Sequence, residues 1–165
     1  MKSMKWAVVL AVGVSMGFAG GVFAAAAKKE MALTPAADVK WAPLDPKQPE
    51  GAQLSVVFGD MAKKGPLGVL LKFPPGATPG PHTHTAEYWG VVIKGVEHNF
   101  AGDNEGPGLG PGAHWFQPGK QVHNNKCEPG SECIVFLYLN GKFDFAPAPE
   151  AKAGGDMKPA DKPAK

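Results

Sequence analysis

The chain of 165 residues has a formal net charge of +2, with 17 basic and 15 acidic residues. Every basic residue is a lysine, so the usual bidentate clamp for carboxylate and phosphate groups is absent from the sequence. This composition argues against nucleic acid as a partner, which needs a concentrated basic face, and against a tightly held nucleotide, sugar phosphate or 2-oxo-acid co-substrate.

Residues 1–26 have the layout of a secretory signal peptide. Two lysines precede an almost wholly apolar run from Trp6 to Ala19, and small residues near Ala24 offer cleavage positions. The apolar run is shorter than the roughly 20 residues that a membrane-spanning helix needs. We therefore expect a nearly neutral mature chain that is periplasmic or secreted and is not attached to a membrane.

Short strand-like runs separated by glycine and proline fill residues 39–146. We expect a loose lead segment over residues 27–38, one all-β domain over 39–146 and a disordered tail over 147–165, which is rich in Pro, Ala, Gly and Lys. Many short strands with such turns predict an antiparallel sandwich or a small antiparallel β-barrel. The runs are VKWAPL, QLSVVFGDM, GVLLKFPPG, EYWGVVIKG, VEHNF, GAHWFQP, QVHNNKC and CIVFLYLNGKFDF.

The segment PGPHTHTAEYWGVVIKG holds two of the five histidines in the chain. His82 and His84 are two residues apart, so on a strand their imidazoles point to the same face. From Glu87 onward, Glu87, Trp89, Val91 and Ile93 alternate with more polar positions, so we expect this face to point inward. A carboxylate on an inward face needs a partner or a metal ion, which makes Glu87 a candidate ligand.

A third histidine, His123, follows a Pro-Gly turn in WFQPGKQVHNN. A closed β fold can bring it beside His84. Three neutral imidazoles and a carboxylate form a mixed nitrogen and oxygen site that suits a divalent transition metal such as Fe, Mn, Zn, Cu or Ni.

The only two cysteines, Cys127 and Cys133, flank the turn sequence EPGSE. Two strands joined by this turn would bring the cysteines close together. In an oxidising compartment we expect a disulfide across the hairpin.

These residues resemble the two sequence motifs of the cupin superfamily, and the resemblance covers roughly residues 39–146. In the first motif, Gly76 lies five residues before His82, followed by His84, a carboxylate and Gly95. In the second motif, Gly112 lies five residues before Pro118, and His123 follows. The resemblance implies a cupin-type jelly roll with His82, His84, Glu87 and His123 as metal ligands, and it implies a homodimer.

The sequence departs from the family pattern at several positions. Tyr88 fits the spacing of the carboxylate better than Glu87 does, so the fourth ligand stays open between these two residues. Lys120 and Cys127 replace the glycine and the asparagine of the second motif. Of the remaining histidines, His114 is a candidate acid–base group and His98 is expected to be structural, while Trp115 and Gln117 are candidate pocket residues.

Two classes of function remain open at this point. The first is a metal-dependent oxygenase or isomerase that acts on a small molecule. The second is a metal-binding or small-ligand-binding protein, a sensor or a carrier, without catalysis. The cupin scaffold hosts both classes, so the fold alone does not choose between them.

Overall fold

The computed structural model describes residues 30–148; the expected signal peptide and most of the expected tail lie outside this range. The body of the fold begins at Thr34. The described part of the lead segment is exposed, and its one regular element is the 3-10 turn η1 (Ala36–Asp38). Between residues 30 and 148, no helix is long and apolar enough to cross a membrane.

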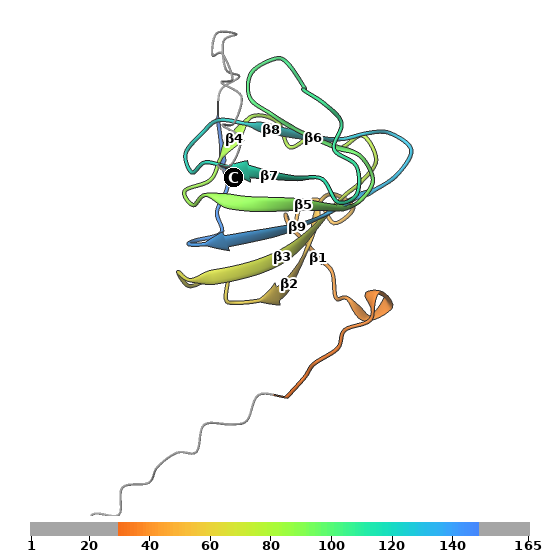
Figure 1. The fold of residues 1–165 in the computed structure, drawn as a ribbon, viewed down its shortest axis with the longest axis vertical. Helices are drawn as coiled ribbons and strands as arrows, with labels where there is room; N and C mark the ends of the chain where they lie inside the picture. The colour runs from red at the N-terminus through yellow and green to blue at the C-terminus, as the bar shows by residue number, and fades with distance from the viewer. Residues whose placement is uncertain (1–29, 149–165) are drawn as a thin grey trace, which may run out of the picture. The chain divides into compact units, whose positions relative to one another are not determined.

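Ten short strands make up the regular structure of this body (Figure 1). In chain order they are β1 (Ala42–Pro43), β2 (Gln53–Phe58), β3 (Pro66–Phe73), β4 (His82–Thr83), β5 (Tyr88–Lys94), β6 (Glu97–Phe100), β7 (His114–Gln117), β8 (Asn124–Cys127), β9 (Cys133–Asn140) and β10 (Ala146–Pro147).

The largest layer is a six-stranded antiparallel sheet in the order β1-β2-β3-β9-β5-β7. In Figure 1 this sheet runs from β2 through β3, β9 and β5 to β7, and β6 and β8 lie beyond β7. A hydrogen bond of 3.3 Å from Asn99 Nδ2 on β6 to Gln117 Oε1 on β7 links the two parts.

Two smaller pairs, β10-β4 and β6-β8, form the second layer. They are joined by an antiparallel bridge between His82 and His123, just before β8. The expected all-β antiparallel jelly roll is therefore confirmed. Within residues 30–148 the strand ladders do not close into one continuous barrel.

The apolar core lies on the inner face of the large sheet. Strand β9 alternates between buried and less buried residues along its length, and its buried members are Cys133, Val135, Leu137 and Leu139. Strand β3 supplies most of the facing leucine and valine side chains. These two neighbouring strands lie in the middle of the large sheet and supply much of the apolar core.

The expected facing of β5 is wrong. Tyr88, Gly90 and Val92 are buried, whereas Trp89 and Ile93 are about half exposed. The expectation failed because it assumed that the more apolar face points inward. Here Tyr88 on the inner face lines a cavity, and the outer face of the strand is itself apolar.

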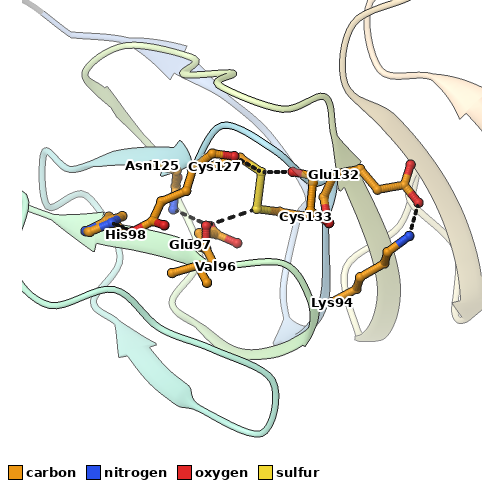
Figure 2. Close-up of a disulfide and its surroundings, with 10 residues drawn as sticks. Lys94, Val96, Glu97, His98, Asn125, Cys127, Glu132 and Cys133 are labelled. Carbon is orange, nitrogen blue, oxygen red and sulfur yellow. Dashed lines mark hydrogen bonds and ion pairs between the residues drawn. A yellow bond between two sulfur atoms is a disulfide. The ribbon is translucent and has the colours of Figure 1, made fainter.

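Two features of the chain ends and loops complete the fold. Pro147, expected to begin the tail, pairs with His82 through β10, so the ordered domain extends past residue 146. The expected disulfide is confirmed: Cys127 and Cys133 are bonded, with their Cα atoms 5.7 Å apart (Figure 2). The expected hairpin is wrong, because β8 pairs with β6 whereas β9 pairs with β3 and β5, so the bond links two different sheets.

Candidate metal centre and adjoining cavity

The structure brings three of the four predicted ligands together. His82, His84 and His123 each offer one ligand atom, and these atoms all lie within 4.8 Å of one another. His82 and His123 are about 2% exposed. Two strand segments about 40 residues apart in sequence meet here because His82 and His123 form the bridge that joins the two small sheets.

The Nδ1 atom of each of these three histidines lies against a backbone carbonyl. His82 Nδ1 is 2.7 Å from Gly80 O, His123 Nδ1 is 3.1 Å from Gln121 O, and His84 Nδ1 contacts Asp144 O. A carbonyl oxygen can only accept, so each Nδ1 carries the proton and each Nε2 keeps its lone pair. Such backbone contacts fix the tautomer and ring orientation that metal-binding histidines need.

Tyr88 is the fourth side chain at the centre. Its hydroxyl lies 3.0 Å from His123 Nε2 and, given the tautomer above, donates a hydrogen bond to it. Burial is the main reason that the pKa of Tyr88 is raised, so the phenol stays protonated. An ion bound to His123 Nε2 would have to displace this hydroxyl.

Glu87 is not part of the cluster. It is exposed, precedes β5 and lies outside the group of ligand atoms that the three histidines form. Its selection depended on the inward-face assumption that the structure overturns. Of the two residues between which the sequence left the fourth position open, Tyr88 is the one that faces the histidines.

The segment that follows β9 covers the histidines. The ring of Phe145 stacks on His82 with a centroid distance of 4.7 Å, and Asp144 Oδ1 accepts a 2.8 Å hydrogen bond from the backbone N–H of Thr85. Together with the contact between Asp144 O and His84, these interactions hold the loop after β4 in place.

The electrostatics of the centre favour neutral imidazoles. Burial, together with the charges of His82 and His84, lowers the pKa of His123 to about 4. Burial also lowers the pKa of His82. Neutral imidazole is the form that binds a metal ion, so the protein environment keeps two of the three candidate ligands in the binding form at neutral pH.

A cavity of about 830 Å³ adjoins the histidines. His82, His84 and Tyr88 line it at one place, and its wall also includes Phe73, Leu137 and Phe145 among other apolar side chains. Its ionisable lining residues other than histidine and tyrosine are the acidic residues Asp45, Glu97 and Asp144. Apolar walls with a few polar groups are typical of small-molecule sites.

Glu97 is the most deeply buried charged residue of the cavity wall, at 1% exposure. Its Oε1 accepts a 3.0 Å hydrogen bond from Asn125 Nδ2, next to the disulfide (Figure 2). Burial raises the pKa of Glu97 to about 7, although the Asn125 hydrogen bond opposes the rise.

The remaining candidates from the sequence fall into two groups. Trp115 lines the cavity, and Gln117 is buried beside it in hydrogen bonds to Asn99 and Gln121. His114 is exposed and is not part of the cavity wall. His98 makes a 3.0 Å contact with Glu128, which raises the pKa of His98 and fits the structural role expected for it.

Sequence reasoning missed Glu97, Asn125 and Phe145. Glu97 and Asn125 lie on short strands that pair with each other, and nothing in the spacing of VEHNF or QVHNNKC marks them as cavity residues. Phe145 lies in the closing GKFDF run, and only the pairing of β10 with β4 places it over the histidines.

Solved structures with the same fold include several cupins and cupin-like enzymes. The RmlC-like cupin from Ralstonia eutropha JMP134 aligns at 19% identity over 68% of this chain and 69% of its own, with a TM-score of 0.55. The polyketide cyclase RemF from Streptomyces resistomycificus aligns at 18% identity over 74% and 89%, with a TM-score of 0.59. The DMSP lyase DddQ from Ruegeria pomeroyi DSS-3 aligns at 16% identity over 67% and 61%, with a TM-score of 0.54.

These likenesses confirm that the fold is that of the cupin superfamily. No curated protein sequence matches the chain. Residues 30–163 match the model of DUF4437, described as a domain of unknown function, and the chain belongs to this family.

Proposed function

We propose that this protein is a periplasmic or secreted cupin that binds one divalent transition metal through His82, His84 and His123 and acts on a small molecule in the adjoining cavity. The observation that carries the proposal is the convergence of three imidazoles whose Nδ1 atoms all face backbone carbonyls. Three neutral imidazoles suit Fe, Zn, Cu and Ni.

The location depends on two observations. The signal-peptide pattern of residues 1–26 predicts export. The disulfide between Cys127 and Cys133 supports an oxidising compartment, because such bonds persist outside the cytosol.

Of the activities open to a cupin, we favour a metal-dependent isomerisation or a related proton-transfer reaction. A bound divalent ion would supply Lewis-acid chemistry. Tyr88 holds a proton 3.0 Å from His123, and Glu97 holds one on the cavity wall, so protons are available beside a polarised substrate. RemF and DddQ, named as a cyclase and a lyase, support the use of this fold for small-molecule chemistry.

The acidic lining and the absence of arginine favour an uncharged or weakly charged substrate. Asp45 and Asp144 would repel an anion, and no lysine is among the described residues that line the cavity. This agrees with the exclusion of nucleotides, sugar phosphates and 2-oxo-acid co-substrates drawn from the composition.

Metal binding is tested by elemental analysis and isothermal titration of the wild-type chain, of His82→Ala with His84→Ala, and of His114→Ala. We expect one ion per chain in the wild type and in His114→Ala, whose imidazole is exposed and outside the cluster. We expect loss of stoichiometric metal in the double variant. Full metal occupancy in the double variant would overturn the assignment.

Catalysis is tested by deuterium exchange into small ketones and aldehydes, followed by NMR. The metal-loaded wild type should accelerate exchange next to the carbonyl, and the His82→Ala, His84→Ala variant should not. A metal-loaded protein that exchanges none of a broad panel would favour the binding or carrier function instead.

We also propose a homodimer through the outer face of the large sheet. Trp89, Phe116, Phe58 and Tyr138 are each 38–52% exposed on this face. Trp89 and Phe116 have ring centroids 4.8 Å apart, and Phe58 and Tyr138 are 6.4 Å apart. A contiguous apolar patch of this kind is typical of an interface.

Sedimentation velocity tests the dimer. Trp89→Lys should convert a dimer to a monomer, whereas Ser131→Lys, at an exposed loop position away from the patch, should not. A monomeric wild type at micromolar concentration would contradict the proposal.

A further inference from the structure

Two buried polar atoms in the described structure have no hydrogen-bond partner, and both belong to residues of the cavity wall. They are Glu97 Oε2 and Trp115 Nε1. A buried polar group without a partner destabilises the fold, so such atoms are rare in proteins. Because both residues line the cavity, a molecule that enters the cavity is a candidate source of the missing partner.

The Glu97 carboxyl group is held in place from its other oxygen. Asn125 Nδ2 donates to Glu97 Oε1 at 3.0 Å and to Asn99 Oδ1 at 2.8 Å, and Asn99 in turn donates to Gln117. This chain of amides crosses from β8 through β6 to β7. It leaves Oε2 as the oxygen of Glu97 without a partner among the described residues.

The neutral form of Glu97 fits this environment. The carboxyl group is 1% exposed and forms no ion pair with any lysine within residues 30–148. An ionised carboxylate buried in this way would need a cation or further donors. With Oε1 accepting from Asn125, the proton of the neutral acid resides on Oε2, so Oε2 and Trp115 Nε1 both act as donors.

Both residues lie near Tyr88, which ties them to the histidine end of the cavity. The charge of Glu97 contributes to the raised pKa of Tyr88, and an interaction with the Trp115 side chain opposes that rise. The Tyr88 and Trp115 rings meet edge to face with centroids 6.4 Å apart.

The position of the Trp115 side chain also depends on a glycine. Gly90 lies opposite Trp115 in the pairing of β5 with β7, and a Cβ at residue 90 would lie 2.2 Å from the indole ring. The indole is therefore packed over the backbone of β5.

We infer that Glu97 and Trp115 form a second polar subsite of the cavity, separate from the three histidines, that binds the carbonyl oxygen of a small uncharged ligand. A carbonyl oxygen has two lone pairs and no proton to donate, so its best partners are two hydrogen-bond donors. The inference rests on the proposed function for the presence of a small-molecule ligand, but it does not require the metal.

The test uses three probes of similar size on the metal-free, ¹⁵N-labelled full chain at pH 6. Acetophenone carries a carbonyl oxygen, ethylbenzene has no polar atom and benzylamine is a cation. The readout is the indole N–H signal of Trp115 in a ¹H–¹⁵N spectrum, identified by its disappearance in Trp115→Phe. We expect acetophenone to shift this signal saturably and to bind at least about fivefold more tightly than ethylbenzene.

Three variants separate the contribution of the two donors to ligand affinity from that of the apolar cavity wall. Glu97→Gln keeps an acceptor for Asn125 and a donor for the ligand, so acetophenone affinity should stay within about twofold of the wild type. Glu97→Leu should lose about fivefold or more, with ethylbenzene affinity unchanged. Trp115→Phe, followed by ligand-observed NMR, should lose a similar factor and serves where Glu97→Leu does not fold.

Three results would overturn the inference. Equal affinities for acetophenone and ethylbenzene would mean that the two atoms bind only water. Tighter binding of benzylamine, lost in Glu97→Gln, would mean that an ionised carboxylate binds cations. Failure of all three probes to bind would remove the subsite. Because the protein is metal-free throughout, none of these results decides whether the histidines bind an ion.

Discussion

His82 and His123 exchange both of their backbone hydrogen bonds, with N to O distances of 2.9 Å and 3.0 Å. This pairing joins the β4-β10 pair to the β6-β8 pair, and it also places the two imidazole rings with centroids 4.3 Å apart. This one backbone pairing therefore joins the two strand pairs of the second layer, and it also brings together two of the three histidines of the candidate metal centre. An ion held by both residues would fasten these two strand pairs together.

Metal binding should therefore stabilise the fold. A ligand that binds only the folded state adds about 2.7 kcal/mol to the free energy of unfolding at 100 times its Kd. We expect urea unfolding of the wild type to show this gain with the preferred ion and the His82→Ala, His84→Ala variant to show none. An equal gain in both proteins would place the ion elsewhere.

Replacing Tyr88 with phenylalanine should strengthen metal binding. The Tyr88 hydroxyl occupies the lone pair of His123 Nε2, and an entering ion has to displace it. Without the hydroxyl we expect about fivefold higher affinity by titration and a loss of about 1 kcal/mol in metal-free stability. Glu87→Gln is the matched control and should change neither, because Glu87 is exposed. Weaker binding in Tyr88→Phe would instead make the phenol a ligand.

The depressed pKa of His123 should make the metal-free protein less stable in acid. The unfolded chain takes up a proton near the ordinary pKa of 6.5, whereas the folded chain resists protonation down to about pH 4. The stability contributed by neutral His123 is therefore present above about pH 6.5 and lost as the pH falls toward 4. We expect roughly 2 kcal/mol less loss between pH 7 and pH 4 in His123→Gln than in the wild type, measured by urea unfolding. His114→Ala should keep the wild-type slope, and identical slopes in all three proteins would refute the prediction.

Glu97 should act in the opposite direction. Its pKa is about 7 in the folded chain, against an ordinary value of 4.5, because burial disfavours the charged form. The protonated Glu97 side chain makes its full contribution to the free energy of unfolding below about pH 4.5, and this contribution is lost as the pH rises through 7. The stability of Glu97→Gln relative to the wild type should therefore rise by roughly 2–3 kcal/mol between pH 4.5 and pH 8.

The neighbouring titratable groups decide how that experiment is read. The charge of His98 lowers the pKa of Glu97, and His98 itself contacts Glu128. We therefore repeat the comparison of Glu97→Gln with Glu97 in a His98→Gln background. This background removes the charge of His98, so the remaining difference in stability belongs to the Glu97 carboxyl group. A relative stability that stays flat across this pH range in both backgrounds would show that Glu97 is ionised throughout.

Removal of the disulfide should weaken the connection between β8 and β9, which lie in different sheets. Cys127 and Cys133 are six residues apart in sequence, so the loop that the bond closes is short. A loop of this size predicts a loss of about 2 kcal/mol in the free energy of unfolding for Cys127→Ala with Cys133→Ala. Urea unfolding of the oxidised wild type and the double variant measures it. No change on removing both cysteines would show that the pairing of β8 with β6, and of β9 with β3 and β5, holds this connection without the bond.

The fold and the three histidines were predictable because each has a local signature. Short strands with glycine and proline turns predicted the antiparallel architecture, and the spacing of His82, His84 and His123 matched the cupin motifs. The disulfide followed from two cysteines that flank one turn. Each of these inferences needed only neighbouring residues or a known pair of motifs.

The remaining parts of the site depend on which strands face each other, and no local pattern records that. Both faces of β5 are apolar enough to be inward, so hydrophobicity selected Glu87 over Tyr88 and was wrong about the face. Glu97 looks like an ordinary polar residue of a short strand. Only the pairing of β6 with β8, and the position of the cavity, reveal it as a buried acid.

The carbonyl of Asp144 and the ring of Phe145 reach the histidines from a segment about 60 residues further along the chain. During synthesis, a ribosome that has delivered residues 82 to 123 has made all three imidazoles, but not the segment that orients His84 and covers His82. A nascent polypeptide therefore acquires its mature histidine geometry only after β10 has emerged. Ion loading would accordingly be a late event in the biogenesis of this protein.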